Sequence, residues 1–92
     1  MQILRLQAVK GKFGHRSDAS VYNDIRDGKF TAGVLIGQRA KGWPDYEVDA
    51  IITARIAGKS DDQIRDLVKV LHANRTGLLN TPQAQRAVLA IA

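Results

Sequence analysis

The chain has no cysteine, one glutamate, and two histidines that lie far apart, at positions 15 and 72. The absence of cysteine excludes disulfide frameworks, thiolate zinc sites and cysteine nucleophiles. A metal or acid–base site would have to be assembled from scattered aspartates, so we expect neither an enzyme nor a bound cofactor. No apolar run approaches the ~18 residues that a membrane span needs, and residues 1–13 lack the apolar core of a signal peptide. These absences favour a cytoplasmic protein that makes no contact with a membrane.

The chain has 92 residues and a mass of 10.1 kDa, which is enough for one small core. A chain of this length buries only about 60–65% of its unfolded surface, too little for a deep cleft between two domains. Hydrophobic residues make up 45% and charged residues 25% of the sequence, as in ordinary globular folds. We therefore expect a compact fold and not a disordered tail.

The positive charge is distributed unevenly along the chain. Residues 1–43 hold eight basic and three acidic side chains, which accounts for the whole net charge of +5, because residues 44–92 hold six of each sign. A one-sided basic surface is typical of proteins that bind nucleic acid. A solvated surface that is basic by chance is the alternative that charge alone leaves open.

The first part of the chain predicts two short helices joined by a turn. Apolar spacing indicates a helix over Leu6–Lys12, followed by a second over Asp18–Asp27. Ser17 is a good N-cap for the second helix, and Gly28 is a typical residue just after a helix end. We expect Gly14 to end the first helix, so that helix, turn and helix form the first structural unit.

The next segment predicts a small β-hairpin. Val34–Ile36 is rich in β-branched residues, residues 37–39 form a turn, and Ala40–Trp43 supplies the return strand. Arg39 and Lys41 place two cations at the tip and on the return strand.

Three further helices are expected toward the end of the chain. Residues 44–58 begin with a proline, which suits the first turn of a helix. Ser60 and Gln63 form a capping box before a helix that runs to about Ala73. A last short helix is expected over residues 82–91.

The helix behind the capping box has one apolar face. The residues of this stripe follow helical spacing and are Ile64, Leu67, Val68 and Leu71. The stripe either folds back on the core of the same chain or mediates self-association with a second copy. We accordingly divide the chain into a DNA-binding domain over residues 1–59 and a helical extension over residues 60–92, which packs on that domain or on a partner.

Two helices, a basic hairpin and a supporting helix form the order of a winged helix-turn-helix, a mostly α fold with a small β-hairpin. In the second predicted helix, Val21 and Ile25 face the core. The opposite face carries Ala19, Ser20, Asn23 and Arg26. Small, amide and guanidinium groups suit a helix that reads base edges in the major groove.

Several segments in addition resemble a known family in their order and spacing. They are Leu4-Arg5-Leu6, Ser17 to Tyr22, Gly28-Lys29-Phe30, Val34 to Gly37, Arg39, Trp43 and Glu47 to Ile51. Over residues 3–57 the chain resembles the AlpA family of small phage and prophage regulators, which are related to excisionases and more distantly to MerR-type domains. The resemblance implies a bacterial or phage-encoded, nucleoid-associated protein. It also implies that helix 17–27 enters the major groove while the hairpin tip at 37–41, the wing, contacts the backbone or the minor groove.

Two residues depart from the family pattern: Asp18 stands where a basic residue is common, and Thr31 where a proline is usual. Arg16 is the neighbouring cation that can replace the missing charge. We expect Trp43 to be a core residue, whereas Tyr22 is either packed or a phosphate donor. The expected DNA contacts are Arg16, Ser17, Ala19, Ser20, Tyr22, Asn23, Arg26, Lys29, Arg39 and Lys41.

The sequence thus predicts a non-enzymatic, sequence-specific protein whose partners are double-stranded DNA and, in an excision role, an integrase. The resemblance implies transcriptional control of the integrase gene, excision of the element, or both, and the sequence does not choose between them. The alternative is a protein-interaction adaptor or inhibitor that uses the apolar C-terminal helix.

Overall fold

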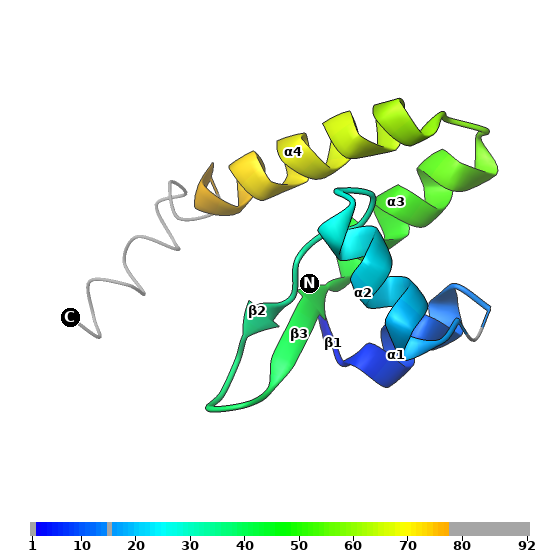
Figure 1. The fold of residues 1–92 in the computed structure, drawn as a ribbon. Helices are drawn as coiled ribbons and strands as arrows, with labels where there is room; N and C mark the ends of the chain where they lie inside the picture. Colours follow the sequence, from blue (N-terminus) through cyan, green and yellow to red (C-terminus); the bar gives the residue numbers. More distant parts are fainter. Residues whose placement is uncertain (1, 15, 78–92) are drawn as a thin grey trace.

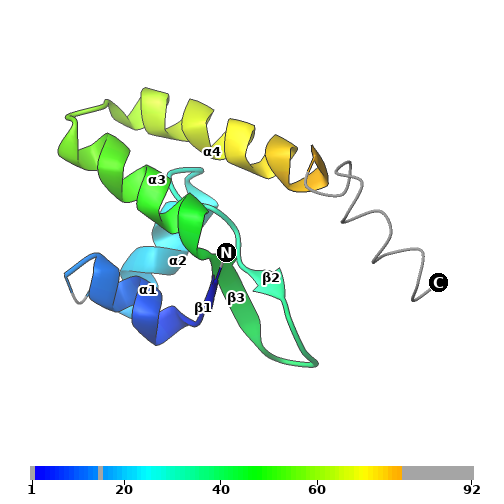
Figure 2. The same ribbon diagram turned by 180° about the vertical axis from the view of Figure 1, so that it is seen from behind.

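The computed structural model describes residues 2–14 and 16–77 of the chain. In chain order the elements are β1 (Ile3–Leu4), α1 (Leu6–Lys12), α2 (Asp18–Arg26), β2 (Val34–Leu35), β3 (Lys41–Pro44), α3 (Asp45–Ile56) and α4 (Asp61–Gly77). Helices α1 and α2 lie together on one side, the β2–β3 hairpin (residues 34–44) projects away from them, and α4 runs along α3 on the far side from α1 (Figures 1 and 2). This mostly helical arrangement with a small antiparallel sheet is a winged helix-turn-helix fold.

The sheet has three strands in the order β1-β3-β2, one more than the predicted hairpin. Leu4 pairs with Trp43, and Val34 pairs with Gly42, both in antiparallel register. A Cβ atom at Gly42 would collide with the side chain of Ile3, so this glycine lets β1 lie against β3. Strand β1 was missed because it forms only by pairing with β3, which is far away in the sequence.

The predicted ends of α2 are confirmed to within one residue. The Ser20 N–H donates to Ser17 Oγ over 3.1 Å, so Ser17 is the N-cap. Gly28 adopts a φ of 77°, and the next N–H, that of Lys29, donates to the carbonyl of Asp24 at 2.8 Å. This is the left-handed helix ending that glycine favours.

Trp43 is the largest side chain of the core and has no exposed surface. Its indole Nε1–H donates to the Thr31 carbonyl over 2.9 Å, so its polar atom is also satisfied. The other buried apolar residues are Leu4, Val9, Val21, Phe30, Val48, Ile51, Ile64, Val68 and Leu71. The prediction that Trp43 is structural is confirmed.

Helix α4 begins with the predicted capping box. The Ser60 N–H donates to Gln63 Oε1 at 2.9 Å, and the Gln63 N–H donates back to Ser60 Oγ at 3.2 Å. The helix continues to Gly77, beyond the predicted end at Ala73. The expected helix over residues 82–91 lies outside the described residues.

The apolar stripe of α4 packs on the chain's own core. Ile64, Val68 and Leu71 are buried, and Leu67 is partly buried against the same cluster. The three buried side chains are therefore not available for the self-association that the sequence left open. Among the helices that the structure describes, none combines the length and the hydrophobicity needed to cross a membrane.

Candidate nucleic-acid interface

Helix α2 has a buried and an exposed face, as its sequence predicts. Val21 is buried, and Ile25 packs partly on the core. Ala19, Asn23 and Arg26 are exposed on the other side. Ser20 is half-buried, and its hydroxyl accepts a hydrogen bond from the Ser17 hydroxyl at 3.0 Å. Tyr22 also belongs to the accessible surface, with 43% of its area exposed, so a phosphate contact through it stays a prediction.

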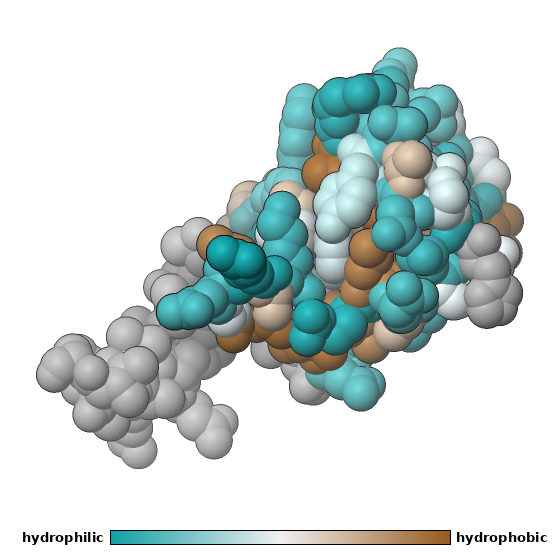
Figure 3. All heavy atoms as spheres, turned by 60° about the horizontal axis from the view of Figure 1, so that its bottom comes forward, coloured by the Kyte–Doolittle hydropathy of each residue, from teal (hydrophilic) through white to brown (hydrophobic). Residues whose placement is uncertain are grey.

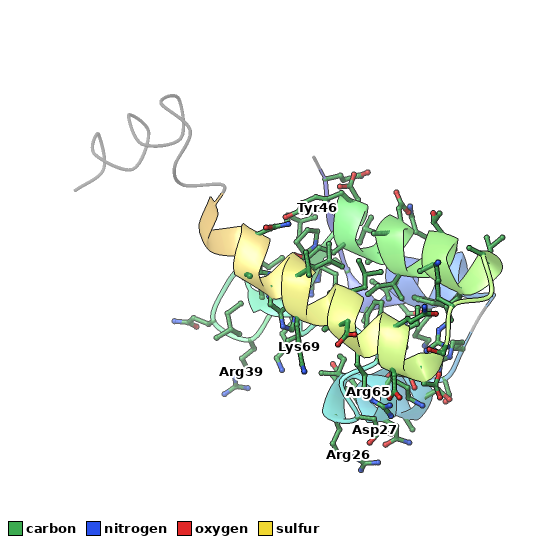
Figure 4. All side chains as sticks on the ribbon, turned by 90° about the horizontal axis from the view of Figure 1, so that it is seen from above. Arg26, Asp27, Arg39, Tyr46, Arg65 and Lys69 are labelled. Carbon is green, nitrogen blue, oxygen red and sulfur yellow. The ribbon has the colours of Figure 1, made fainter. Side chains whose placement is uncertain are left out.

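The β2–β3 hairpin carries its two cations into solvent. Ile36 N–H donates to the Ala40 carbonyl at 2.9 Å and closes the tip, where Arg39 and Lys41 are both exposed. In Figure 4 the labelled Arg39 of the hairpin and Arg26 of α2 project toward the same side of the molecule. The hairpin and α2 therefore present positive charge in a common direction.

A groove separates the β2–β3 hairpin from the helices and joins their exposed side chains into one surface. This basic groove has a volume of about 360 Å³ and is lined by Arg5, Leu6, Gln7, Tyr22, Arg39, Lys41 and Trp43. Figure 3 brings this lower face of the molecule forward and shows a largely hydrophilic surface with a few apolar residues between. The groove is open to solvent.

In the described part of the chain, no acidic neighbour neutralises the cations of the basic groove. Within residues 2–14 and 16–77, no carboxylate lies within 4.0 Å of the charged nitrogens of Arg5, Arg39 or Lys41. Lys12, by contrast, is 2.7 Å from Asp49. The uncompensated positive charge of the first half of the chain is thus concentrated at the groove.

Two predicted contact residues are turned toward an internal carboxylate. Arg16 Nη1 lies 2.6 Å from Asp24 Oδ2, and its guanidinium stacks 5.6 Å from the centre of the Phe13 ring. Lys29 Nζ lies 3.9 Å from the same Asp24. Their charge is partly compensated inside the molecule, so a DNA contact through them stays a prediction.

Asp18, which departs from the family pattern, forms an ion pair with Lys10 of α1. The pair joins the starting turn of α2 to the end of α1. It also places an opposite charge next to the Asp18 carboxylate, which partly compensates its negative charge.

Arg5 and Gln7 are groove residues that the sequence did not predict as contacts. Arg5 precedes α1 and is exposed, as is Gln7 in the first turn of that helix. They reach the groove because β1 pairs with β3 and so places the start of α1 beside the hairpin. Arg5 belongs to the Leu4-Arg5-Leu6 segment that resembles the family, and this was the one available signal.

A family of prophage regulators matches this part of the chain. The model of the family described as prophage CP4-57 regulatory protein (AlpA) matches residues 2–56, more than half of the sequence. The chain belongs to the AlpA family. The match covers β1 to the last residue of α3 and therefore includes α2, the hairpin and every residue that lines the basic groove.

Helix α4 lies beyond the part of the chain that matches the AlpA family. No curated protein and no solved structure matches the chain. The AlpA relationship establishes a prophage regulatory protein.

Proposed function

We propose that this AlpA-family chain regulates a prophage or integrative element by binding double-stranded DNA in a sequence-specific manner. Helix α2 enters the major groove, and the β2–β3 hairpin lies on the adjacent backbone or minor groove. The observation that carries the proposal is the basic groove, which borders α2 and where Arg5, Arg39 and Lys41 have no acidic partner among the residues that the structure describes. Cations that are not neutralised internally are the ones that displace counterions from DNA.

Sequence reading is assigned to the exposed face of α2. Asn23 is suited to the paired donor and acceptor of adenine, and Arg26 to the two acceptors of guanine or to a phosphate. Both side chains are exposed, and 72% of the Arg26 side chain is accessible. Ser17 and Ser20 lie at the start of the same helix, where backbone N–H groups and hydroxyls can approach a phosphate.

For the prophage or integrative element, the proposed role is transcriptional control of the integrase gene, action as an excision factor that works with an integrase, or both. Either role uses the same DNA-binding surface. The rival function, an adaptor that docks through the apolar face of α4, is disfavoured because Ile64, Val68 and Leu71 are buried in the chain's own core.

Replacing Lys41 with alanine is expected to weaken binding to any DNA duplex and to flatten its salt dependence. Each phosphate contact contributes about −0.9 to the slope of log K against log salt concentration, so the slope should become shallower by roughly one unit. Fluorescence anisotropy with a labelled random-sequence duplex, repeated at several salt concentrations, measures this slope.

Lys59→Ala is the matched control, because Lys59 is an exposed lysine in the α3–α4 connection, at the opposite end of the molecule from the hairpin (Figures 1 and 2). We expect it to leave the slope unchanged. Equal slopes for wild type and Lys41→Ala would remove the hairpin from the interface, and salt-independent retention of DNA would overturn the proposed mode of binding.

A further inference from the structure

Side chains of α4 form hydrogen bonds with both backbone polar groups of Ala32, a residue just before the β2–β3 hairpin. The Ala32 N–H donates to His72 Nε2 at 3.1 Å, and the Ala32 carbonyl accepts from Arg75 Nη2 at 2.8 Å. His72 and Arg75 are three positions apart, so they lie on the same face of the helix. A helix outside the matched family segment thus grips the chain between α2 and β2.

The same stretch of chain is held from its other side by Trp43. The Thr31 carbonyl accepts the indole N–H, and a Cβ atom at Gly33 would lie only 3.0 Å from the Trp43 ring. Residues 31–33 are therefore fixed between the core and α4. Strand β2 begins at the next residue, Val34, so this fixed stretch sets the direction in which the hairpin leaves the core.

Arg75 is itself anchored by a buried carboxylate. Its Nε and Nη2 atoms lie 2.8 Å and 2.6 Å from the two oxygens of Glu47, which has no exposed surface. This bidentate geometry fixes the plane of the guanidinium. The hydrogen bond from Arg75 to the Ala32 carbonyl is consequently fixed in position. Of the two residues that bind Ala32, His72 is the one that titrates near neutral pH.

The hydrogen bond from Ala32 requires a neutral His72, because a protonated imidazole has no lone pair left to accept at Nε2. Burial and then the charge of Arg75 lower the pKa of His72 below its ordinary value of 6.5, and Glu47 opposes this shift. The folded state therefore binds a proton at His72 less readily than the unfolded chain does, and folding stability decreases as the pH falls below about 6.5.

Other charged groups line the cavity that His72 also lines. In this cavity of about 370 Å³ they are Arg26 and Asp27 at the end of α2, and Arg65 and Lys69 on α4. Figure 4 shows these four side chains on one side of α4. Tyr46 of α3 is neutral near and below pH 6.5, because burial raises the pKa of its hydroxyl from its ordinary value of 10. Of these groups, Arg26 lies 3.6 Å from Asp27 and Arg65 lies 2.8 Å from Asp62, so the charges that act on His72 are those of Arg75 and Glu47.

We propose that His72 and Arg75 are positioning residues for the β2–β3 hairpin: through Ala32 they hold Arg39 and Lys41 in the orientation that binds DNA, and protonation of His72 releases that hold. The expected effect on DNA binding rests on the proposed function. The hydrogen bonds that His72 and Arg75 form with Ala32 are a property of the free protein and can be measured without DNA.

The first test follows His72 and Ala32 by NMR in the free full-length protein as the pH is lowered. We expect the imidazole to titrate with a midpoint below 6.5 and the Ala32 amide resonance to shift with the same midpoint. The Nε2 atom should be unprotonated at pH 7.5. A His72 titration midpoint at or above pH 6.5, or an Ala32 amide resonance that does not shift with that titration, would contradict the proposed role of His72 in positioning Ala32. This outcome does not depend on whether the protein binds DNA.

The second test asks whether protonation of His72 changes the contribution of the hairpin to DNA binding. It measures how much Lys41→Ala weakens binding to a random-sequence duplex at two pH values. At 0.1 M salt one phosphate contact contributes roughly five- to tenfold in affinity. We expect that loss at pH 7.5, and a loss of less than twofold one pH unit below the His72 midpoint. His72→Gln is the matched variant, because its amide oxygen can accept from Ala32 without titrating. In that background the Lys41→Ala loss should be the same at both pH values.

The other histidine, His15, is present in every variant and cancels from this comparison. A Lys41→Ala loss that is equal at both pH values in the otherwise wild-type protein would overturn the proposed release while leaving DNA binding intact. A protein that binds no duplex at pH 7.5 would overturn the proposed function, and the NMR titration would still decide the hold.

Discussion

Replacing Trp43 with alanine is expected to lower the free energy of unfolding by about 3–5 kcal/mol, the usual cost of truncating a buried tryptophan. Trp43 is fully buried, and its indole N–H is the donor to the Thr31 carbonyl. A small domain has only about 5–15 kcal/mol of stability in total, so a large fraction of the variant should unfold near 37 °C. Thermal melts followed by far-ultraviolet circular dichroism measure the loss, and DNA affinity should fall together with the helical signal.

Tyr22→Ala is the matched control, because Tyr22 is an aromatic residue of the groove that is 43% exposed. It should change the melting temperature little and act mainly on DNA affinity. If Trp43→Ala instead kept the wild-type melting temperature and lost only DNA affinity, the tryptophan would be a surface residue that stacks on DNA, and the orientation of the hairpin would be inverted.

Replacing Arg75 with alanine is expected to destabilise the fold by a similar amount, about 3–5 kcal/mol, because it leaves the charge of Glu47 buried without its partner. Glu47 has no exposed surface, and both of its oxygens are bonded to Arg75. The Ala32 carbonyl loses its donor in the same variant. Equilibrium unfolding in urea at pH 7.5 measures the change in free energy.

A double variant, Arg75→Met with Glu47→Leu, separates the cost of an unpaired charge from the loss of packing. Replacing both members of a buried pair by apolar residues of similar volume is often close to neutral, so we expect the double variant to recover most of the lost stability. A single Arg75→Ala variant as stable as wild type would show that the Glu47 carboxylate finds water or another partner.

Local signals explain how much of the fold could be predicted. Ser17 and Gly28 mark the ends of α2 by hydrogen bonds and a backbone conformation that depend on a few neighbouring residues. The capping box of Ser60 and Gln63 has the same local character. Such features are encoded within one turn of helix, and for this reason the helix starts were correct.

Features that depend on distant residues were missed. The pairing of Ile3 with Pro44 creates β1 across forty residues of chain, and it is this pairing that brings Arg5 to the groove. Glu47 and Arg75 are 28 positions apart and carry no common motif. The contacts that Arg75 makes also explain why α4 extends past the predicted end at Ala73.

Counting charge placed the excess in the first half of the chain but could not say which cations are uncompensated. Lys10 and Arg16 are paired with aspartates of α2, and Lys12 with one of α3. Only the three-dimensional arrangement shows that Arg39 and Lys41 remain without such partners among the described residues. The candidate interface therefore contains fewer cations than the charge count indicated. It also includes Arg5, which was not among the predicted contacts.

The most direct test of DNA binding through α2 and the hairpin is an NMR titration of the full-length protein with a short DNA duplex at low salt. The largest amide shifts are expected along the exposed face of α2 and the basic groove, at Asn23, Lys41 and Arg5, with little change around Lys59 in the α3–α4 connection. Saturable shifts centred on the outer faces of α3 and α4, or no shifts at all, would contradict the account.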